Sequence, residues 1–318
     1  MAVRQTTKRE HNKRKRTMSN NAIEVEGLVK HFGAVVALDG LDLSVPQGQV
    51  TGFLGPNGAG KTTTIRILLG LIKADGGNAT LLGGNPWTDA VALHKRLAYV
   101  PGDVALWPNL TGGQIIDVLG RLTGGLDAKR RAQMIERFQL DPSKKAGTYS
   151  KGNRQKVALV AALASTSELL LLDEPTSGLD PIMEAEFQAV IKEMKSEGRS
   201  ILLSSHIFAE VESLADSVTI IREGRTVESG TLAELRHLSR TQVSVRTNTP
   251  VAIQSIPGVQ GAQVDGDEIS FSVASDDWPR VMSAMSTLKI DNLTANPPSL
   301  EQIFLSLYSD ELPAEATK

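Results

Sequence analysis

From residue 22 to about 235, short apolar or β-branched runs alternate with stretches in which apolar residues recur every three or four positions. The first pattern predicts strands and the second predicts helices. We expect strands at 22–25, 41–45, 50–54, 79–82, 97–100, 169–172, 200–204, 217–221 and 226–228. We expect helices at 61–71, 115–122, 128–138, 154–164, 182–194 and 209–214. Because 169–172 is apolar throughout, we expect a parallel α/β sheet that is covered on both faces.

No strand is expected between residues 111 and 164, so the pattern predicts a helical subdomain inserted into the sheet at about 105–165. The helix expected at 182–194 has the clearest pattern, because its apolar residues fall on one face at a period of 3.6. These residues are Met183, Phe187, Val190, Ile191 and Met194.

The pattern changes after about residue 240. Ile269, Phe271 and Val273 alternate with polar residues behind an Asp265-Gly266 turn, which predicts a hairpin. A helical stripe follows at Trp278, Val281, Met282, Met285 and Leu288, and after Pro297-Pro298 the pair Ser299 and Gln302 forms a capping box that opens a last helix. We interpret these apolar and Met-containing stripes as core. The sequence therefore predicts a small α+β domain without catalytic residues of its own.

The expected organisation is a basic, disordered tail at 1–20, a nucleotide-binding domain at 21–238 and a small accessory domain at 239–318. Residues 1–20 carry a net charge of +6 in a chain whose formal net charge is −2, so the body is acidic. An acidic body argues against a broad nucleic-acid-binding face, which needs clustered cations. The tail has no apolar core and is not expected to be a secretory signal. Met18 stands as an alternative start to Met1.

Two further features limit the function. The chain has no Cys, which excludes disulfide scaffolds and cysteine nucleophiles. The most apolar stretch, 157–172, is shorter than the ~20 residues that a membrane-spanning helix needs and contains Glu168. We therefore expect no membrane span.

The strongest motif is a glycine-rich loop between the strand expected at 50–54 and the helix expected from 61. It reads Gly55-Pro56-Asn57-Gly58-Ala59-Gly60-Lys61-Thr62 and continues with Thr63. The spacing fits G-x-x-x-x-G-K-[ST], and a strand before it with a helix after it is the context that the motif requires. Its glycines let backbone N–H groups surround a phosphate, Lys61 neutralises phosphate oxygens, and the Thr62 hydroxyl can ligate Mg²⁺. The sequence thus predicts an ATP site.

Acidic residues follow the buried strand expected at 169–172. Asp173 and Glu174 stand at its carboxyl end, where open α/β sheets bind ligands. Asp173 can hold Mg²⁺, and Glu174 can reach an attacking water as general base. His206 ends another buried run at the same predicted edge, so we expect it near the γ-phosphate. The other four His residues lack metal-ligand spacing, and no protein-only metal site is predicted.

With these landmarks in this order, the chain resembles the nucleotide-binding subunit of an ABC transporter. The resemblance implies further site residues. Tyr149-Ser150-Lys151-Gly152-Asn153 stands where the family has its LSGGQ-like signature, and Asp180 ends a Ser177-Gly178-Leu179-Asp180 stretch that matches the D-loop. Phe32 precedes Gly55 by 23 residues, where the family places an aromatic that stacks on adenine. A core position is the alternative for Phe32.

The resemblance also implies a head-to-tail dimer of two copies around two ATP molecules, in which Ser150 and Gly152 of one copy cover the phosphates held by Lys61 of the other. Two departures are notable. Lys151 and Asn153 replace Gly and Gln of the signature, and Lys151 either adds charge or faces solvent. The Q-loop glutamine is missing, because Gly102-Asp103 follows Tyr99-Val100-Pro101. We expect Asp103 to take over part of the Mg²⁺ and coupling role.

A single cassette without a membrane segment is similar to subunits that dock on a separate membrane permease at the cytoplasmic face of the cell membrane. The stretch from Pro297 to Phe304 resembles the tail of ATPase subunits of ABC-2-type exporters, and YSKGNRQK at 149–156 resembles antibiotic-resistance exporters of the tetronasin type. The resemblance therefore implies an ATPase that powers export of a drug-like substrate. The alternatives are an importer ATPase, a cytosolic ABC ATPase acting on ribosomes or nucleic acids, and a cassette that only binds ATP.

Overall fold

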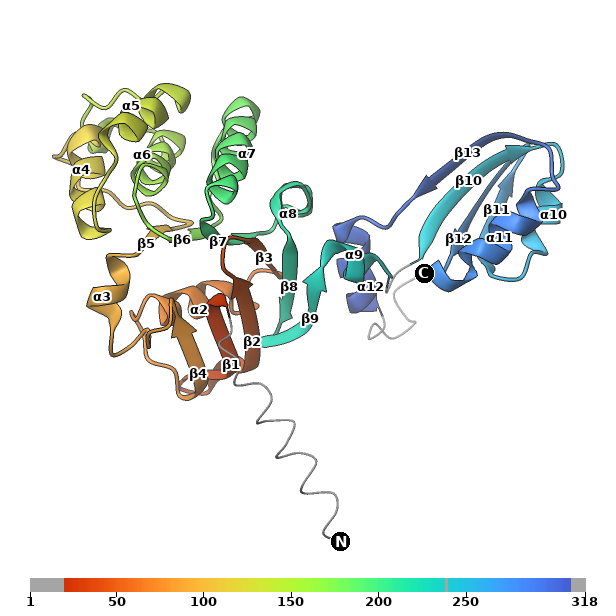
Figure 1. Ribbon diagram of the computed structural model, residues 1–318, viewed down its shortest axis with the longest axis horizontal. Coiled ribbons are helices and arrows are strands. Elements are labelled where there is room, and N and C mark those ends of the chain that lie inside the picture. The colour runs from red at the N-terminus through yellow and green to blue at the C-terminus, as the bar shows by residue number, and fades with distance from the viewer. Residues whose placement is uncertain (1–19, 238–239, 310–318) are drawn as a thin grey trace, which may run out of the picture.

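The computed structural model describes residues 20–237 and 240–309, and its centre is a six-stranded sheet with the strand order β5-β6-β7-β3-β8-β9 (Figure 1). The first five strands of this order are parallel and β9 pairs antiparallel with β8. The bounds are β3 (Val50–Leu54), β5 (Leu97–Val100), β6 (Leu169–Asp173), β7 (Ser200–Ser205), β8 (Ser217–Arg222) and β9 (Arg225–Thr231). The α/β fold predicted from the sequence is confirmed.

A second sheet packs beside the first and consists of β1 (Asn21–Phe32), β2 (Val35–Pro46) and β4 (Gly76–Leu81) in the order β2-β1-β4. β1 and β2 are each 12 residues long, much longer than the predicted strands. Of the additional residues, Leu28 and Leu38 are buried, whereas His31 and Val36 near the hairpin end are exposed. Glu26-Gly27 in β1 and Asp39-Gly40 in β2 interrupt the apolar pattern, so the prediction covered only one end of each strand.

The two faces of the six-stranded sheet carry separate cores. In β6, Leu169 and Leu171 face the core shared with β1, β2 and α2 (Lys61–Leu68), whereas Leu170 and Leu172 face the core shared with the helices on the other side. Alternate residues of a strand point to opposite faces. A strand that is buried on both faces must therefore be apolar at every position, as β6 is.

Helices fill the predicted insertion. They are α4 (Gly112–Leu122), α5 (Ala128–Arg137), the 3₁₀ turn η1 (Ala146–Thr148) and α6 (Lys151–Leu163), and α3 (Ala90–His94) precedes β5. Ion pairs connect the insertion to α7 (Pro181–Ser196): Arg137 contacts Glu186 and Glu193. Helix α2 ends at Leu68, earlier than predicted, and Gly70 follows with a φ of 66°. A residue in that left-handed region cannot continue the helix.

The C-terminal part forms a four-stranded antiparallel sheet with the order β11-β12-β10-β13. Its elements are β10 (Thr241–Thr247), α10 (Pro250–Gln254), β11 (Val259–Asp265), β12 (Glu268–Val273), η2 (Ser275–Asp277), α11 (Trp278–Met285) and β13 (Ile290–Asn296). This βαββαβ sequence is the ferredoxin-like arrangement. The predicted hairpin at Asp265-Gly266 connects β11 to β12, and Ile269, Phe271 and Val273 are buried in the core of this sheet.

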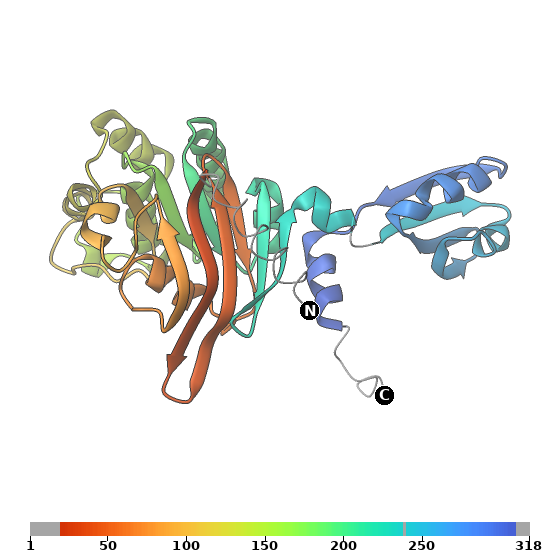
Figure 2. The same cartoon turned by 60° about the horizontal axis from the view of Figure 1, so that its bottom comes forward.

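The last described helix returns to the first part of the molecule. In Figure 1 the β10–β13 sheet lies at one end of the long axis, but α12 (Leu300–Ser309) lies back beside α9 (Leu232–His237). Leu300 and Ile303 of α12 are buried in the same core as β7 and α8 (Phe208–Leu214). Ser299 and Gln302 form the predicted capping box. Figure 2 shows α12 crossing between the two sheet-containing parts.

Within the described residues, no helix combines the length and apolar character that a membrane crossing requires. The predicted basic tail at 1–20 lies outside the described residues except for Asn20.

Candidate nucleotide site

The glycine-rich loop follows β3 and opens α2, as predicted. Gly60 is the N-cap of α2 with a φ of 110°, and a Cβ there would lie 2.7 Å from Leu38 Cδ2 and 3.0 Å from Ala37 O. Both the backbone conformation and the close approach of β2 require glycine at this position. In the described part of the chain, the amide groups of Gly60, Lys61 and Thr62 have no hydrogen-bond acceptor. Such free N–H groups at a helix N-terminus form an anion site.

Lys61 lies in the centre of this loop. Its Nζ donates to Gly55 O at 2.7 Å and to Pro56 O at 3.2 Å, and the side chain is buried. Burial lowers the pKa of Lys61 below its ordinary value, and the carboxylates of Glu174 and Asp173 oppose that shift. The ammonium group therefore has only neutral carbonyl partners but lies close to two acidic groups at the end of β6.

The predicted Mg²⁺ ligands lie together. Thr62 Oγ1 donates to Asp173 Oδ2 at 3.2 Å, and Ser204 Oγ of the neighbouring strand β7 donates to Asp173 Oδ1 at 2.5 Å. Asp173 is 4% exposed. A carboxylate beside a hydroxyl at the end of a phosphate loop is a donor set that suits Mg²⁺, which prefers oxygen ligands together with phosphate. The residues present therefore fit a magnesium–nucleotide complex.

Glu174 adopts an unusual backbone conformation at the exit from β6. Its φ is 48°, and its N–H donates to Ser204 O at 2.9 Å. A non-glycine residue in the left-handed region costs on the order of 1–3 kcal/mol and persists where the surroundings fix it. The turn directs the Glu174 side chain toward His206, whose Nδ1 lies 3.4 Å from Glu174 Oε1. The structure thus brings Lys61, Thr62, Asp173, Glu174 and His206 together at one sheet edge.

The signature-like residues lie at the start of α6. Ser150 is its N-cap and accepts from Asn153 N at 3.3 Å. Lys151 Nζ donates to Ser177 Oγ at 3.1 Å, so this side chain contacts the D-loop-like stretch of its own chain. A Cβ at Gly152 would lie 2.5 Å from Gly178 O. These two contacts join the beginning of α6 to the stretch that follows Glu174.

The four other predicted positions are Asp180, Phe32, Gly102 and Asp103. Asp180 caps α7 by accepting from Ile182 N and Met183 N at 3.1 and 3.0 Å. Phe32 is 49% exposed at the end of β1, with Lys30 Nζ 5.4 Å from its ring centroid, and is therefore not a core residue. Gly102 lies against the end of β6, since a Cβ there would be 3.2 Å from Asp173 O. Asp103 follows it and is exposed.

The sequence did not indicate three polar contacts of the site. Ser204 binds Asp173, Gln155 Nε2 of α6 donates to Pro175 O at 2.9 Å, and Glu210 of α8 accepts from Ser205 Oγ at 2.6 Å. Ser204 and Ser205 were visible as polar residues at the end of an otherwise apolar strand. Gln155 and Glu210 looked like ordinary polar positions on helices, so no local signal pointed to them.

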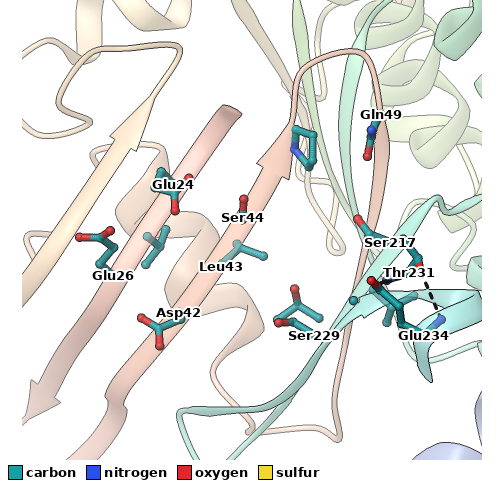
Figure 3. Close-up of a pocket in the computed structure, with 15 residues that line it drawn as sticks. Glu24, Glu26, Asp42, Leu43, Ser44, Gln49, Ser217, Ser229, Thr231 and Glu234 are labelled. Atoms are coloured by element: carbon teal, nitrogen blue, oxygen red, sulfur yellow. Dashed lines mark hydrogen bonds between the residues drawn. The ribbon is translucent and has the colours of Figure 1, made fainter. Parts of the chain in front are cut away.

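A groove elsewhere on the molecule does not suit a nucleotide. It has a volume of about 610 Å³ between the β1–β2 face and β8–β9, and Figure 3 shows Glu24, Glu26, Asp42 and Glu234 around it. None of its lining residues is Lys, Arg or His. It also includes Gln49, at the opposite end of β3 from the phosphate loop. Triphosphate binding needs cations, so charge and position both assign ATP to the glycine-rich loop instead.

Comparison with known proteins agrees with this geometry. The family model described as "ABC transporter" matches residues 38–177, and the model "ATP-binding protein DrrA1-3-like, C-terminal domain" matches residues 230–308. The daunorubicin/doxorubicin resistance ATP-binding protein DrrA of Streptomyces peucetius is 32% identical, with 92% of this chain and 93% of the relative covered. DrrA3 of Streptomyces coeruleorubidus is 34% identical, with 92% and 98% covered. The chain belongs to the ATP-binding subunits of ABC transporters.

Solved ABC cassettes have the same fold. A structure described as the ATP-binding subunit of an ABC transporter superposes with a TM-score of 0.64 at 30% identity, covering 68% of this chain and 92% of that chain. A dimeric cassette bound to ADP and Pi superposes with a TM-score of 0.60 at 21% identity, covering 66% and 98%, and shows the fold alone. This ABC subunit is an ATPase that binds ATP, as the sequence predicted.

Proposed function

We propose that this ABC subunit hydrolyses ATP to power export of a drug-like or antibiotic molecule through a separate membrane permease. The observation that carries the proposal is similarity over 92% of the chain to daunorubicin-resistance ATP-binding proteins, including the C-terminal part. The bacitracin transport ATP-binding protein BcrA of Enterococcus faecalis supports it at 34% identity over 69% of this chain and 72% of the relative.

In the proposed reaction, Lys61 and the free N–H groups of the loop bind the β- and γ-phosphates. Thr62 and Asp173 hold Mg²⁺, which supplies charge neutralisation when it is bound. The hydrogen bond from Ser204 fixes the Asp173 carboxylate in the orientation that leaves Oδ2 beside Thr62. Phe32, exposed on the β1–β2 hairpin, offers its ring to the adenine base.

Glu174 is the proposed general base. Its side chain accepts a proton from the attacking water, and His206 orients that carboxylate and contacts the γ-phosphate. The 3.4 Å separation of His206 Nδ1 and Glu174 Oε1 supports this pairing. Exposure of the His206 side chain leaves it accessible to a phosphate.

We further propose that two copies assemble head to tail, with Ser150 and Gly152 covering the phosphates held by Lys61 of the second copy. Gly152 and Lys151 lie against Gly178 and Ser177 in the same chain, so the start of α6 is joined to the segment that follows Glu174. Asp180 contributes from the end of that segment. Asp103, exposed beside the Asp173 backbone through Gly102, takes the place of the missing Q-loop glutamine.

An apolar groove supports docking of the permease. It has a volume of about 500 Å³ between α3, α4, α6 and β5, and Val91, Leu71 and Leu122 are among its lining residues. These three side chains are 80%, 61% and 61% exposed. Burial raises the pKa of Tyr99, in the same groove, to about 12, so its phenol stays neutral. A groove of exposed apolar residues with His94, Lys95 and Arg121 at its margin fits an amphipathic helix with an acidic side. Docking there would hold this ABC subunit peripherally at the cytoplasmic face of the membrane.

The test is affinity purification of tagged Glu174→Gln protein from detergent-solubilised membranes with MgATP. We expect a multi-span membrane protein in stoichiometric amount. Val91→Arg should abolish its recovery while basal ATP hydrolysis is retained, and Val251→Arg, at a 65% exposed valine of α10, should not. Recovery of ribosomes or DNA-processing proteins without a membrane partner would refute the exporter function. A co-purified permease that drives uptake would favour the importer.

A further inference from the structure

A buried carboxyl group lies behind the loop that carries His206. Glu210 of α8 is 4% exposed, and its Oε2 accepts from Ser205 Oγ at 2.6 Å. Ser205 Oγ in turn accepts from Ile207 N at 3.0 Å. His206 lies between Ser205 and Ile207 in the chain. The Ser205 hydroxyl binds both Ile207 N and Glu210, so the residues on either side of His206 are held in place. Nothing in the sequence motifs or in the roles proposed above uses Glu210.

The same carboxyl group also faces the segment that leaves Glu174. The Thr176 side chain, two residues after Glu174 and 5% exposed, lowers the pKa of Glu210 through a hydrogen-bonding interaction. Glu210 therefore lies between the exits of β6 and β7, the two strands that deliver Glu174 and His206. Because the contact between those two side chains is a single 3.4 Å approach, its geometry depends on how the two exits are held.

The helix that presents Glu210 is itself fixed from outside. Phe208, at the start of α8, contacts Phe304 of α12 with 4.8 Å between ring centroids. Val211 and Leu214 of α8 are buried in the same core as Ile303 of α12. The carboxyl group thus projects from a supported helix rather than from a mobile loop.

Stability alone does not account for a carboxyl group at this position. Burial raises the pKa of Glu210, and its Oε1 has no hydrogen-bond partner among the described residues. A buried polar atom without a partner costs about 1–3 kcal/mol, and an apolar side chain would fill the space without that cost. The Glu210 side chain is therefore a destabilising group that makes one hydrogen bond, with the Ser205 hydroxyl of the residue before His206.

We propose that Glu210 is a positioning residue for ATP hydrolysis. Through the hydrogen bond with Ser205 it fixes His206 against Glu174. Glu210 itself does not touch the nucleotide. The proposal rests on the roles of Glu174 and His206 in the proposed function.

The experiment compares Glu210→Ala, Glu210→Gln and the control Glu212→Gln in the full-length chain. Glu212, on the same helix, pairs with Arg236 of α9 instead of contacting the site. We expect Glu210→Ala to lower kcat at least tenfold with KM for ATP and the Kd of a fluorescent ATP analogue changed less than twofold. Glu210→Gln keeps an oxygen acceptor for Ser205 and should retain kcat within threefold, and Glu212→Gln should match the parent.

A second measurement separates positioning from a structural defect. In a His206→Ala background, Glu210→Ala should lower the residual single-turnover rate by less than twofold, because the residue through which it acts is gone. If Glu210→Ala does not fold, Ser205→Ala removes the same hydrogen bond with α8 intact and should show the same loss of kcat. Unchanged kcat in Glu210→Ala, or equal losses in both backgrounds, would overturn the positioning role. Parent-rate hydrolysis by Glu174→Gln would instead overturn the proposed base.

Discussion

The contact between Gly152 and Gly178 gives a quantitative test of the coupling between α6 and the segment after Glu174. An alanine Cβ at position 152 would lie 2.5 Å from Gly178 O, whereas real Cβ contacts stay above 3.0 Å, so the two backbones must separate by at least 0.5 Å. Both sides are backbone, and neither can rotate away. Lys151 Nζ to Ser177 Oγ at 3.1 Å and Gln155 Nε2 to Pro175 O at 2.9 Å oppose that separation.

Overpacking of this kind costs about 1–3 kcal/mol. For a folded unit of this size, 1 kcal/mol lowers Tm by about 2–4 °C, so Gly152→Ala should lower Tm by roughly 2–12 °C. The measurement is thermal unfolding without nucleotide, which excludes any effect on ATP-dependent dimer formation. Hydrolysis should also fall, because Gly178 is four residues from Glu174.

Gly76→Ala is the matched control. Gly76 lies in β4 outside the left-handed region, and its nearest neighbour, Val29 Cβ, would be at an ordinary 3.4 Å. Its Tm should stay within about 2 °C of the parent, since substitutions away from such contacts change stability by about 0.5 kcal/mol or less. A Gly152→Ala protein that melts with the parent would show that the two segments separate freely, and the coupling argument would fail.

Three further predictions concern single side chains. Lys61→Ala removes the cation of the phosphate loop and should abolish binding of a fluorescent ATP analogue; retained binding would contradict the assignment of the site. Asp103→Ala should lower ATP turnover and its coupling to transport, and unchanged values of both would end the proposed substitution for the Q-loop glutamine. Burial raises the pKa of Glu210, and the Ser205 and Thr176 side chains oppose that rise; the protonated form therefore stabilises the fold at low pH, and this contribution is lost as the pH rises through the raised pKa. Glu210→Gln should therefore melt above the parent at about pH 8, with a difference that disappears toward pH 4; a gap that does not depend on pH would refute this explanation.

Local sequence patterns predicted much of the fold and the phosphate site. The apolar and β-branched runs marked every strand of the six-stranded sheet. The order of Lys61, Asp173 and Glu174 along the chain indicated the ATP site, because Lys61 begins a helix, Asp173 ends a strand and Glu174 follows that strand directly. The C-terminal strands β10, β11 and β13 were missed. Sequences such as TQVSVRT expose a polar face and carry too few apolar residues for recognition.

Long-range polar contacts could not be predicted in this way. Ser204 meets Asp173 across 31 residues of chain, and Gln155 meets Pro175 across 20. Such partners depend on how the strands are ordered in the sheet, which periodicity does not encode. Lys151 illustrates the limit, because its sequence position left solvent and the site as alternatives, and the fold directs it to Ser177.

The position of α12 has a consequence for synthesis of the chain. Its Leu300 and Ile303 complete the core beside β7 and α8, yet about 70 residues separate them from the end of β9. At 5–20 residues per second, translation of that interval takes about 4–14 s, during which the outer face of α8 lacks its cover. Strands β10, β11 and β12 are made early in that time and β13 only just before α12, and the surface beneath Phe304 stays open until α12 emerges. The catalytic half of the molecule is therefore the first to be made and the last to be finished.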